Sequence, residues 1–250
     1  MDENRNEKIP AEIKTKFTAW LDNFWYHYKW HTLISLFLVF AIVVCTLQMC
    51  QKESYDVYVM YAGGHEIERQ ADDGDIPEYK YATLSLNRVS KDYNEDGKTQ
   101  ISLKDLFMLS TEEIEKIEGA NDGKEVNYVL LNENKKILKE TMVYSDYYVC
   151  FLSKAVYEEY KTIDGVEMFA SLAPYVKDGT NVSYYSDSAI YLNSTAFYTL
   201  PGISELPSDT LICLRNLSAF SSHFNKNDAK KAHENSKDLI ENIINYGTNN

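Results

Sequence analysis

The segment Asp92-Tyr-Asn94-Glu-Asp96-Gly97-Lys98 places oxygen-bearing side chains at alternate positions around a glycine. This spacing matches the first half of an EF-hand-type calcium loop, in which the first, third and fifth positions supply side-chain oxygens and the seventh supplies its carbonyl. We therefore predict a calcium site with Asp92, Asn94, Asp96 and the Lys98 carbonyl as ligands.

The second half of this loop departs from the calcium-binding pattern. The eighth position is Thr99 instead of an aliphatic residue, and the twelfth is Leu103, where a bidentate carboxylate would close the cage. The nearest carboxylate able to replace it is Asp105. The alternative interpretation is an acidic surface turn, because Asn, Asp and Gly are preferred in tight turns without any metal.

Gly63-Gly64-His65-Glu66 follows the first apolar run after residue 50 and is a second candidate site. Ligands of open α/β sheets bind beyond the carboxyl ends of strands, so we predict a small-molecule contact at Gly63, Gly64 and His65. The segment lacks the G-x-G-x-x-G spacing of a dinucleotide site. A turn after a strand also favours glycine for its geometry alone.

Arg215 ends a later apolar run, LICLR. Its planar guanidinium can hold a carboxylate through two hydrogen bonds, so we place Arg215 with Gly63 at the predicted ligand pocket. The alternative is a structural ion pair with a nearby acid, since a buried arginine needs a partner.

Motifs of the common enzyme classes are absent from the sequence. There is no G-x-S-x-G elbow, P-loop or C-x-x-C, and His65-Glu66 lacks the second histidine of a zinc-protease helix. We therefore predict a protein without catalytic activity. A hydrolase whose carboxylates come from distant parts of the chain is the third hypothesis, behind two binding or structural roles.

The nineteen residues from Thr32 to Cys50 contain no ionisable side chain other than cysteine, and Trp20, Trp25 and Trp30 precede them. At about 1.5 Å per residue this stretch reaches roughly 28 Å, close to the ~30 Å of a bilayer's hydrocarbon. We predict one transmembrane helix over 32–50, with aromatic side chains at the membrane interface.

The charges beside this helix predict its direction. Lys14, Lys16 and Lys29 precede it, whereas Lys52 is followed at once by Glu53. Basic residues mark the cytoplasmic flank of a transmembrane helix. We therefore predict a single-pass protein of the cell membrane, with its amino terminus in the cytoplasm and residues 51–250 outside the cell. A cleaved signal peptide is the alternative, although its leader would be unusually long and would lack a small-x-small cleavage site.

Residues 1–31 form a predicted cytoplasmic juxtamembrane segment, with apolar and aromatic residues at helical spacing. Two interpretations stay open: a helix lying in the inner headgroup layer, or a cytosolic continuation of the transmembrane helix. Residues 51–250 form one predicted extracytoplasmic domain, long enough to bury a core.

The net charge of −13 belongs entirely to residues 51–250, because five basic and five acidic residues cancel in residues 1–50. An acidic surface repels phosphate backbones, which excludes nucleic acid as a partner. The predicted partners are the lipid bilayer, and a small ligand or a membrane protein.

Four runs are nearly continuous in apolar residues, as in strands covered on both faces: 55–62, 101–108, 147–152 and 210–214. Segments with helical spacing lie between and after them: 110–117, 129–142, 155–160, 166–175, and a last helix from a cap at Asp228 to Gly247. We predict an α/β fold with a mainly parallel or mixed sheet and helices on both faces, preceded by one transmembrane helix. Residues 182–207 are predicted irregular or hairpin-like.

Cysteine usage fits a domain without a dense disulfide framework. Cys45 and Cys50 fall in the predicted span, while Cys150 and Cys213 lie inside apolar runs, where cysteine behaves as a small buried hydrophobe. A bridge between Cys150 and Cys213 requires those two runs to be neighbouring strands.

Read in order, FWYHYKWHTLI, YDVYVMYAGG, DYNEDGK and LICLRNL resemble a group of single-pass membrane proteins of clostridia-like Gram-positive bacteria. DYYVCFLSKAVYEEY with MFASLAPYV is similar to the strand, helix and loop of one lobe of an extracellular solute-binding protein. The resemblance implies an anchored, solute-binding-like domain outside the cell.

The leading functional hypothesis is a membrane-anchored extracytoplasmic binding module for a small ligand, calcium or a protein partner. The alternative is a structural or accessory subunit of a membrane complex, contacted through its aromatic amino-terminal helix. A binding module predicts a concave pocket, and an accessory subunit predicts a flat exposed patch.

Overall fold

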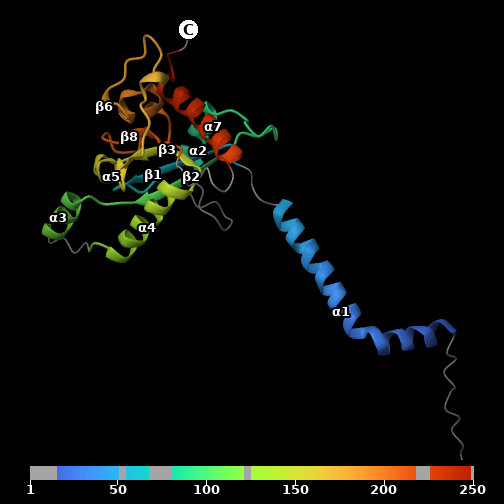
Figure 1. Ribbon diagram of the computed structural model, residues 1–250. Helices are drawn as coiled ribbons and strands as arrows, with labels where there is room; N and C mark the ends of the chain where they lie inside the picture. The colour runs from blue at the N-terminus through green and yellow to red at the C-terminus, as the bar shows by residue number, and fades with distance from the viewer. Residues whose placement is uncertain (1–15, 51–54, 68–79, 121–124, 218–225, 249–250) are drawn as a thin grey trace, which may run out of the picture. The chain divides into compact units, whose positions relative to one another are not determined.

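The computed structural model describes residues 16–50, 55–67, 80–120, 125–217 and 226–248. The chain divides into two compact units, Met1–Glu53 and Ser54–Asn250. In the first unit the described residues form one helix, and in the second they form a layered α/β domain (Figure 1).

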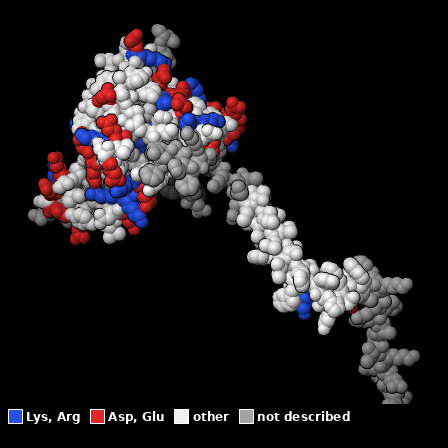
Figure 2. Space-filling view, in the orientation of Figure 1, with Lys and Arg blue, Asp and Glu red and all other residues white. Residues whose placement is uncertain are grey.

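Helix α1 (Lys16–Cys50) contains an apolar stretch of 27 residues from Trp20 to Thr46. No residue in its most apolar part is buried against the rest of the described chain. At 1.5 Å per residue this stretch measures about 40 Å, more than the ~30 Å of a bilayer's hydrocarbon. Figure 2 shows its surface to be almost free of charged side chains. The described chain therefore has one helix long and apolar enough to cross a membrane.

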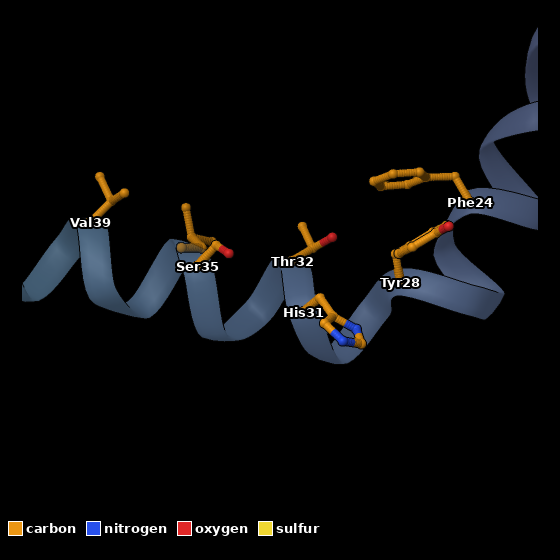
Figure 3. A pocket seen from close by; sticks show the side chains of 7 residues that line it. Phe24, Tyr28, His31, Thr32, Ser35 and Val39 are labelled. Atoms are coloured by element: carbon orange, nitrogen blue, oxygen red, sulfur yellow. The ribbon is translucent and has the colours of Figure 1, made fainter.

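Residues 16–31 of the predicted juxtamembrane segment belong to this same helix, which bends near Phe24 and Tyr28 (Figures 1 and 3). The rings of Trp20, Phe24 and Tyr28 stack at successive helical turns, with centroids 5.7 and 5.3 Å apart. Whether this part lies in the headgroup layer or continues the transmembrane helix into the cytosol stays a prediction. Residues 1–15, which include Lys14, lie outside the described residues.

The sheet has six strands in the order β2-β1-β3-β8-β7-β6. Strands β1, β2 and β3 are mutually parallel, whereas β8, β7 and β6 are joined by antiparallel pairing. The mixed α/β fold is confirmed, with parallel pairing in one half of the sheet. The strands span Val57–Gly63 (β1), Ile101–Phe107 (β2), Tyr147–Leu152 (β3), Tyr184–Ser186 (β6), Ala189–Tyr191 (β7) and Leu211–Leu214 (β8).

Helices cover both faces of the sheet. Alternate side chains of β1 point to opposite faces, so each face contributes to a separate core. Val59 and Tyr61 join the core formed with α2 (Lys80–Val89) and α7 (Lys226–Ile244). Met60 and Ala62 join the core formed with α4 (Tyr128–Tyr144) and α5 (Lys154–Tyr160). The continuous apolar run of β1 thus reflects burial on both faces, as predicted (Figure 1).

The remaining elements are short. Helix α3 (Thr111–Gly119) begins with the capping box of Ser110 and Glu113 that the sequence predicts. Among the residues that the structure describes, the other elements are two small hairpins and three 3-10 turns: β4 (Thr162–Ile163), β5 (Val166–Glu167), β6 with β7, η1 (Ala173–Tyr175), η2 (Leu192–Ser194) and η3 (Ala196–Thr199).

The predicted helix over 166–175 is wrong. Its apolar residues serve different layers: Phe169 packs into the α4–α5 core, and Leu172 packs into the α2–α7 core. The apolar residues have helical spacing here because this segment passes from one face of the sheet to the other and buries a side chain on each. The last helix is confirmed, with Gly247 in the left-handed conformation at φ 77°. The predicted cap at Asp228 is wrong, because Asp228 lies within the first turn, where its charge suits the helix dipole.

Candidate functional site

The structure places Arg215 and Gly63 at opposite ends of the sheet. Gly63 is the last residue of β1, whereas Arg215 follows β8, which runs antiparallel to β3 and ends beside Tyr148. At about 3.3 Å per strand residue, four to five residues separate the two levels by roughly 15 Å. The single pocket predicted to contain both residues is therefore not formed.

Arg215 is fully buried, and its guanidinium binds backbone carbonyls instead of the predicted acid. Its Nε donates to Tyr147 O at 3.1 Å, its Nη1 to Met142 O at 2.7 Å, and its Nη2 to Ser145 O. The guanidinium carbon lies 4.4 Å from the centre of the Tyr148 ring. Burial lowers the pKa of Arg215, but an arginine keeps its charge in proteins.

The carbonyls that Arg215 reaches belong to the carboxyl end of α4 and the turn after it. The last carbonyls of a helix have no partner within the helix, and they carry its negative dipole end. Arg215 thus caps α4 and joins it to the strands β3 and β8. The side chain has a structural role in the described chain.

His233 of α7 lies against the same cluster. Its Nε2 donates to the Arg215 carbonyl oxygen at 3.1 Å, and its ring meets the Tyr148 ring edge-on at 4.9 Å. Burial lowers the pKa of His233, and the Lys237 ammonium lowers it further. Together they outweigh the hydrogen bond to the Arg215 carbonyl and the charge of Glu234, which both raise it. The imidazole is therefore held neutral more strongly in the folded chain than in the unfolded one.

The Gly63-Gly64-His65 turn lies where α/β sheets place ligands. The chain leaves β1 toward α2 on one face of the sheet, and it leaves the neighbouring β3 toward α5 on the other face, which defines a switch point. A Cβ at Gly63 would lie 2.5 Å from the Tyr61 hydroxyl, and one at Gly64 would lie 2.5 Å from a Glu113 carboxylate oxygen. Close packing therefore explains both glycines, and ligand contact at this turn stays a prediction.

The predicted calcium loop is organised by hydrogen bonds to its own backbone. Asp92 accepts from the Asp96 and Gly97 amides, Asn94 from the Asp96 amide, and Asp96 from the Lys98 amide, at 2.8 to 3.2 Å. Glu95 and Gly97 adopt positive φ values of 62° and 83°. The side-chain oxygens at the first, third and fifth positions thus turn toward the loop interior.

Asp56, which the sequence did not single out, anchors this loop to the start of β1. Its two carboxylate oxygens accept from the backbone amides of Tyr93, Asn94 and Gln100 at 2.7, 3.1 and 2.8 Å, and its side chain is buried. Its position directly before an apolar strand could have indicated that Asp56 is buried. A buried carboxylate needs hydrogen-bond donors, and here they come from the loop.

Asp105 does not close the loop. It lies four residues along β2 from Ile101, about 13 Å away at strand spacing, and its Oδ2 accepts from the Ile67 amide at 2.9 Å. Within the described ranges, no group of three His, Cys, Asp or Glu side chains has the spacing of a metal site. Calcium binding by Asp92, Asn94, Asp96 and Lys98 remains a prediction without Asp105 as the missing ligand.

A polar groove of about 500 Å³ lies at the carboxyl ends of α2 and α7, and none of the predicted site residues lines it. Three cations, Arg88, Lys91 and Lys177, line the groove with a single carboxylate, Glu241, so the lining carries a net charge of +2. Asp238, which pairs with Lys91 beside the groove, reduces this charge to +1. The lining of the groove is therefore positive, whereas the chain as a whole has a net charge of −13. Arg88 is exposed, and the described residues give it no ion pair.

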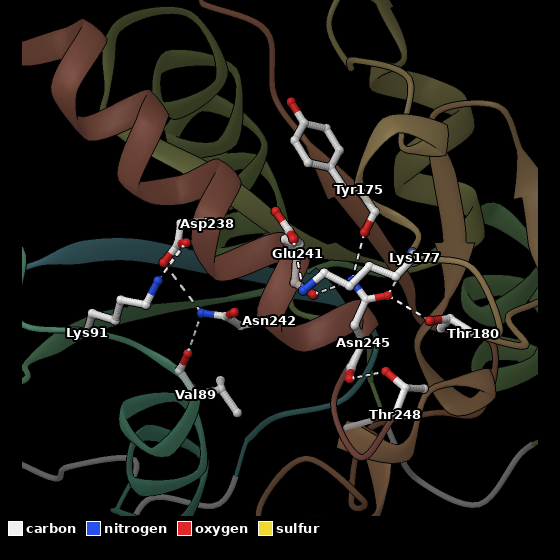
Figure 4. Close-up of polar contacts among 10 residues, drawn as sticks. All are labelled: Val89, Lys91, Tyr175, Lys177, Thr180, Asp238, Glu241, Asn242, Asn245 and Thr248. Carbon is white, nitrogen blue, oxygen red and sulfur yellow. Dashed lines mark hydrogen bonds and ion pairs between the residues drawn. The ribbon is translucent and has the colours of Figure 1, made fainter. Parts of the chain in front are cut away.

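Two side-chain amides, of Asn242 in α7 and of Asn245 just after it, hold the walls of the groove together (Figure 4). Asn242 donates to the Val89 carbonyl at 3.0 Å, which fixes the end of α2. Asn245 is buried and makes four bonds: its Nδ2 donates to the carbonyls of Tyr175 and Glu241, and its Oδ1 accepts from the Lys177 amide and the Thr180 hydroxyl. The segment that carries Lys177 is thereby attached to the helix.

The two lysines of the groove are held by exposed ion pairs. Lys91 Nζ lies 2.8 Å from Asp238, and Lys177 Nζ lies 3.1 Å from Glu241. Burial raises the pKa of Asp238, but hydrogen bonds from Lys91 and Tyr93 outweigh it, and the net shift is downward. Asp238 is therefore a firmly ionised partner of Lys91, whereas the pair of Lys177 with Glu241 rests on one exposed contact.

Comparisons of this chain with protein-family models, with curated protein sequences and with solved structures gave no match.

Replacing Arg215 with Met should lower the free energy of unfolding by about 3–5 kcal/mol, because it leaves the carboxyl end of α4 without its buried donors. Thermal or urea unfolding of the full chain in detergent micelles measures this loss. Arg88→Met is the matched control, and it should stay within about 0.5 kcal/mol of the native chain because Arg88 is exposed. Equal stability of the two variants would contradict the capping role of Arg215.

The domain should lose stability as the pH falls below about 6.5, the ordinary pKa of histidine. Folding lowers the pKa of His233, so in this window the unfolded chain takes up a proton that the folded chain refuses. The melting temperatures at pH 7 and pH 5.5 should differ less in His233→Gln than in the native chain. His65→Gln removes one histidine elsewhere and should keep the native difference; a reduced difference in this control alone would refute the assignment.

Proposed function

We propose that this chain is a membrane-anchored binding protein whose α/β domain lies outside the cell and holds a small anionic ligand in the groove between α2 and α7. The positive lining of this groove carries the proposal. Arg88, Lys91 and Lys177 converge there although the chain as a whole is strongly acidic. Such a local reversal of charge attracts anions to one place on an otherwise repelling surface.

The groove has the dimensions and the chemistry of a small-molecule site. Its volume of about 500 Å³ lies within the usual range of roughly 300–1,000 Å³. Arg88 offers a planar set of donors suited to a carboxylate or a phosphate. The exposed pair of Lys177 with Glu241 contributes at most about 1 kcal/mol, so Lys177 can exchange Glu241 for a bound anion at little cost.

The anchor follows from α1 and from the charges around it. The helix is long and apolar enough to cross a membrane, and Lys14, Lys16 and Lys29 precede its uncharged residues 32–50. The positive-inside rule then assigns Lys29 and the preceding residues to the cytoplasm and the domain to the outer side. The ligand groove accordingly belongs to the extracytoplasmic surface.

A second candidate function, an accessory subunit of a membrane complex, is favoured by one face of α1. Figure 3 shows Phe24 and Tyr28 on the helix with His31, Thr32 and Ser35, and the hollow between these side chains extends to Val39. Ser, Thr and His side chains form hydrogen bonds between transmembrane helices. This face offers a neighbouring helix polar groups inside an apolar surface.

Inorganic phosphate and citrate should raise the melting temperature of the full chain in detergent micelles, by about 5–10 °C at a hundredfold excess over Kd. The Arg88→Met/Lys177→Met variant should lose this rise. Lys135→Met/Lys136→Met changes the charge equally on exposed positions of α4 and should retain it. A rise of equal size with chloride, or an unchanged rise in the groove variant, would argue against the site.

Protease added to intact cells should digest the α/β domain, and alkaline carbonate should leave the rest of the chain in the membrane. Both results follow from an uncleaved anchor with its amino terminus inside. Immunodetection of tags at the two ends reports the outcome. Protection of the carboxyl-terminal tag, with digestion only after cell lysis, would reverse the proposed orientation.

A further inference from the structure

Cys150 of β3 and Cys213 of β8 lie directly opposite each other in the sheet. The antiparallel register pairs them between Val149–Leu214 and Phe151–Ile212. Opposed residues of an antiparallel pair project to the same face, and both cysteines belong to the core between the sheet and α4 with α5. A bridge between the two cysteines requires their strands to be neighbours, and β3 and β8 are neighbours.

The kind of pair determines the spacing of the two cysteines. The Arg215 amide donates to the Tyr148 carbonyl at 2.8 Å, so Tyr148 and Arg215 are a hydrogen-bonded pair. These pairs alternate along an antiparallel ladder, and Cys150–Cys213, two residues further, is again hydrogen-bonded. Such pairs have Cα atoms about 5.5 Å apart, within the spacing of about 4.4–6.8 Å that disulfides adopt.

The surroundings of the pair decide when it can react. Both side chains are fully buried, and the structure holds them as free thiols. Burial raises the pKa of Cys150 to about 12, and burial with the neighbouring Cys150 raises the pKa of Cys213 well above its usual range. Because the thiolate is the attacking species, the pair is inert once the domain has folded.

We propose that Cys150 and Cys213 form a disulfide while the domain folds in an oxidising compartment, so that the parallel and antiparallel halves of the sheet are covalently joined. The oxidant belongs to the class of small-molecule disulfides. One cysteine thiolate attacks this disulfide and releases one thiol, and the second cysteine attacks the mixed disulfide and releases the other. Two protons and two electrons pass from the cysteines to the oxidant. This inference is independent of the anionic ligand.

The bond would enclose residues 151–212, the segment that holds α5 and the irregular part of the domain. Closing a loop of this size restricts the unfolded chain, which stabilises the folded one. A bond between Cys150 and Cys213 would add to the contacts that already join β3 and β8.

The experiment refolds the full chain in detergent micelles with mixed oxidised and reduced glutathione, alkylates free thiols after denaturation, and identifies peptides by mass spectrometry. We expect one linked pair of peptides, containing Cys150 and Cys213, and alkylated Cys45 as the internal control. The oxidised chain should melt about 10 °C above the reduced chain. A Cys213→Ala variant should show no such difference.

Alkylation of both Cys150 and Cys213 after oxidative refolding would overturn the proposal. Linkage of either residue to Cys45 instead would overturn it as well. A second sample, folded under reduction and then exposed to oxidised glutathione, should keep both thiols for far longer than the refolding sample. Equally rapid linkage in that folded sample would refute bond formation during folding.

Discussion

A single buried cation, the guanidinium of Arg215, holds together the parts of the domain that meet at one end of the sheet. It stands after β8, binds the carbonyl of Tyr147 at the start of β3, and reaches the last carbonyls of α4. Its own carbonyl receives the bond from His233 of α7. Because a buried charge must be solvated by polar groups, the positions of these four elements are mutually constrained.

The rest of the domain follows from the two-sided sheet around this cluster. β1 is buried on both faces, and α7 packs on one face beside α2. The same helix that fills this core carries Asn242, and Asn245 follows it, and both side chains bind neighbouring backbone and so shape the polar groove. One helix and the turn after it therefore contribute to both the core and the groove, which explains why residues with no sequence motif come to form a charged hollow.

Sequence patterns predicted the parts of the fold that depend on local periodicity. The strands at 101–107 and 147–152 and the helix α4 lie within a few residues of their predicted bounds. The pattern failed where the chain changes layers, as between Phe169 and Leu172. Helix α2 was not predicted, although its residues are amphipathic at helical spacing. Apolar spacing records which residues are buried, but it does not record on which face of the sheet they are buried.

The candidate sites were harder to predict for a related reason. Strand direction is not visible in sequence, so Arg215 was placed with Gly63 although β8 runs the other way. Nor does composition reveal that a cation will bind carbonyls instead of acids. Asp56 and Asn245 act through backbone groups that come from distant segments, and such partners exist only once the chain has folded.

The position of α7 in the chain affects how the protein is made. Leu239, Ile240 and Ile243 complete the core between α2 and the sheet, yet they are synthesised well after β1 and β3. Until they emerge from the ribosome, part of one face of β1 and β3 is exposed to solvent. A premature stop codon before Lys226 would leave that face uncovered and yield a product for proteolytic clearance.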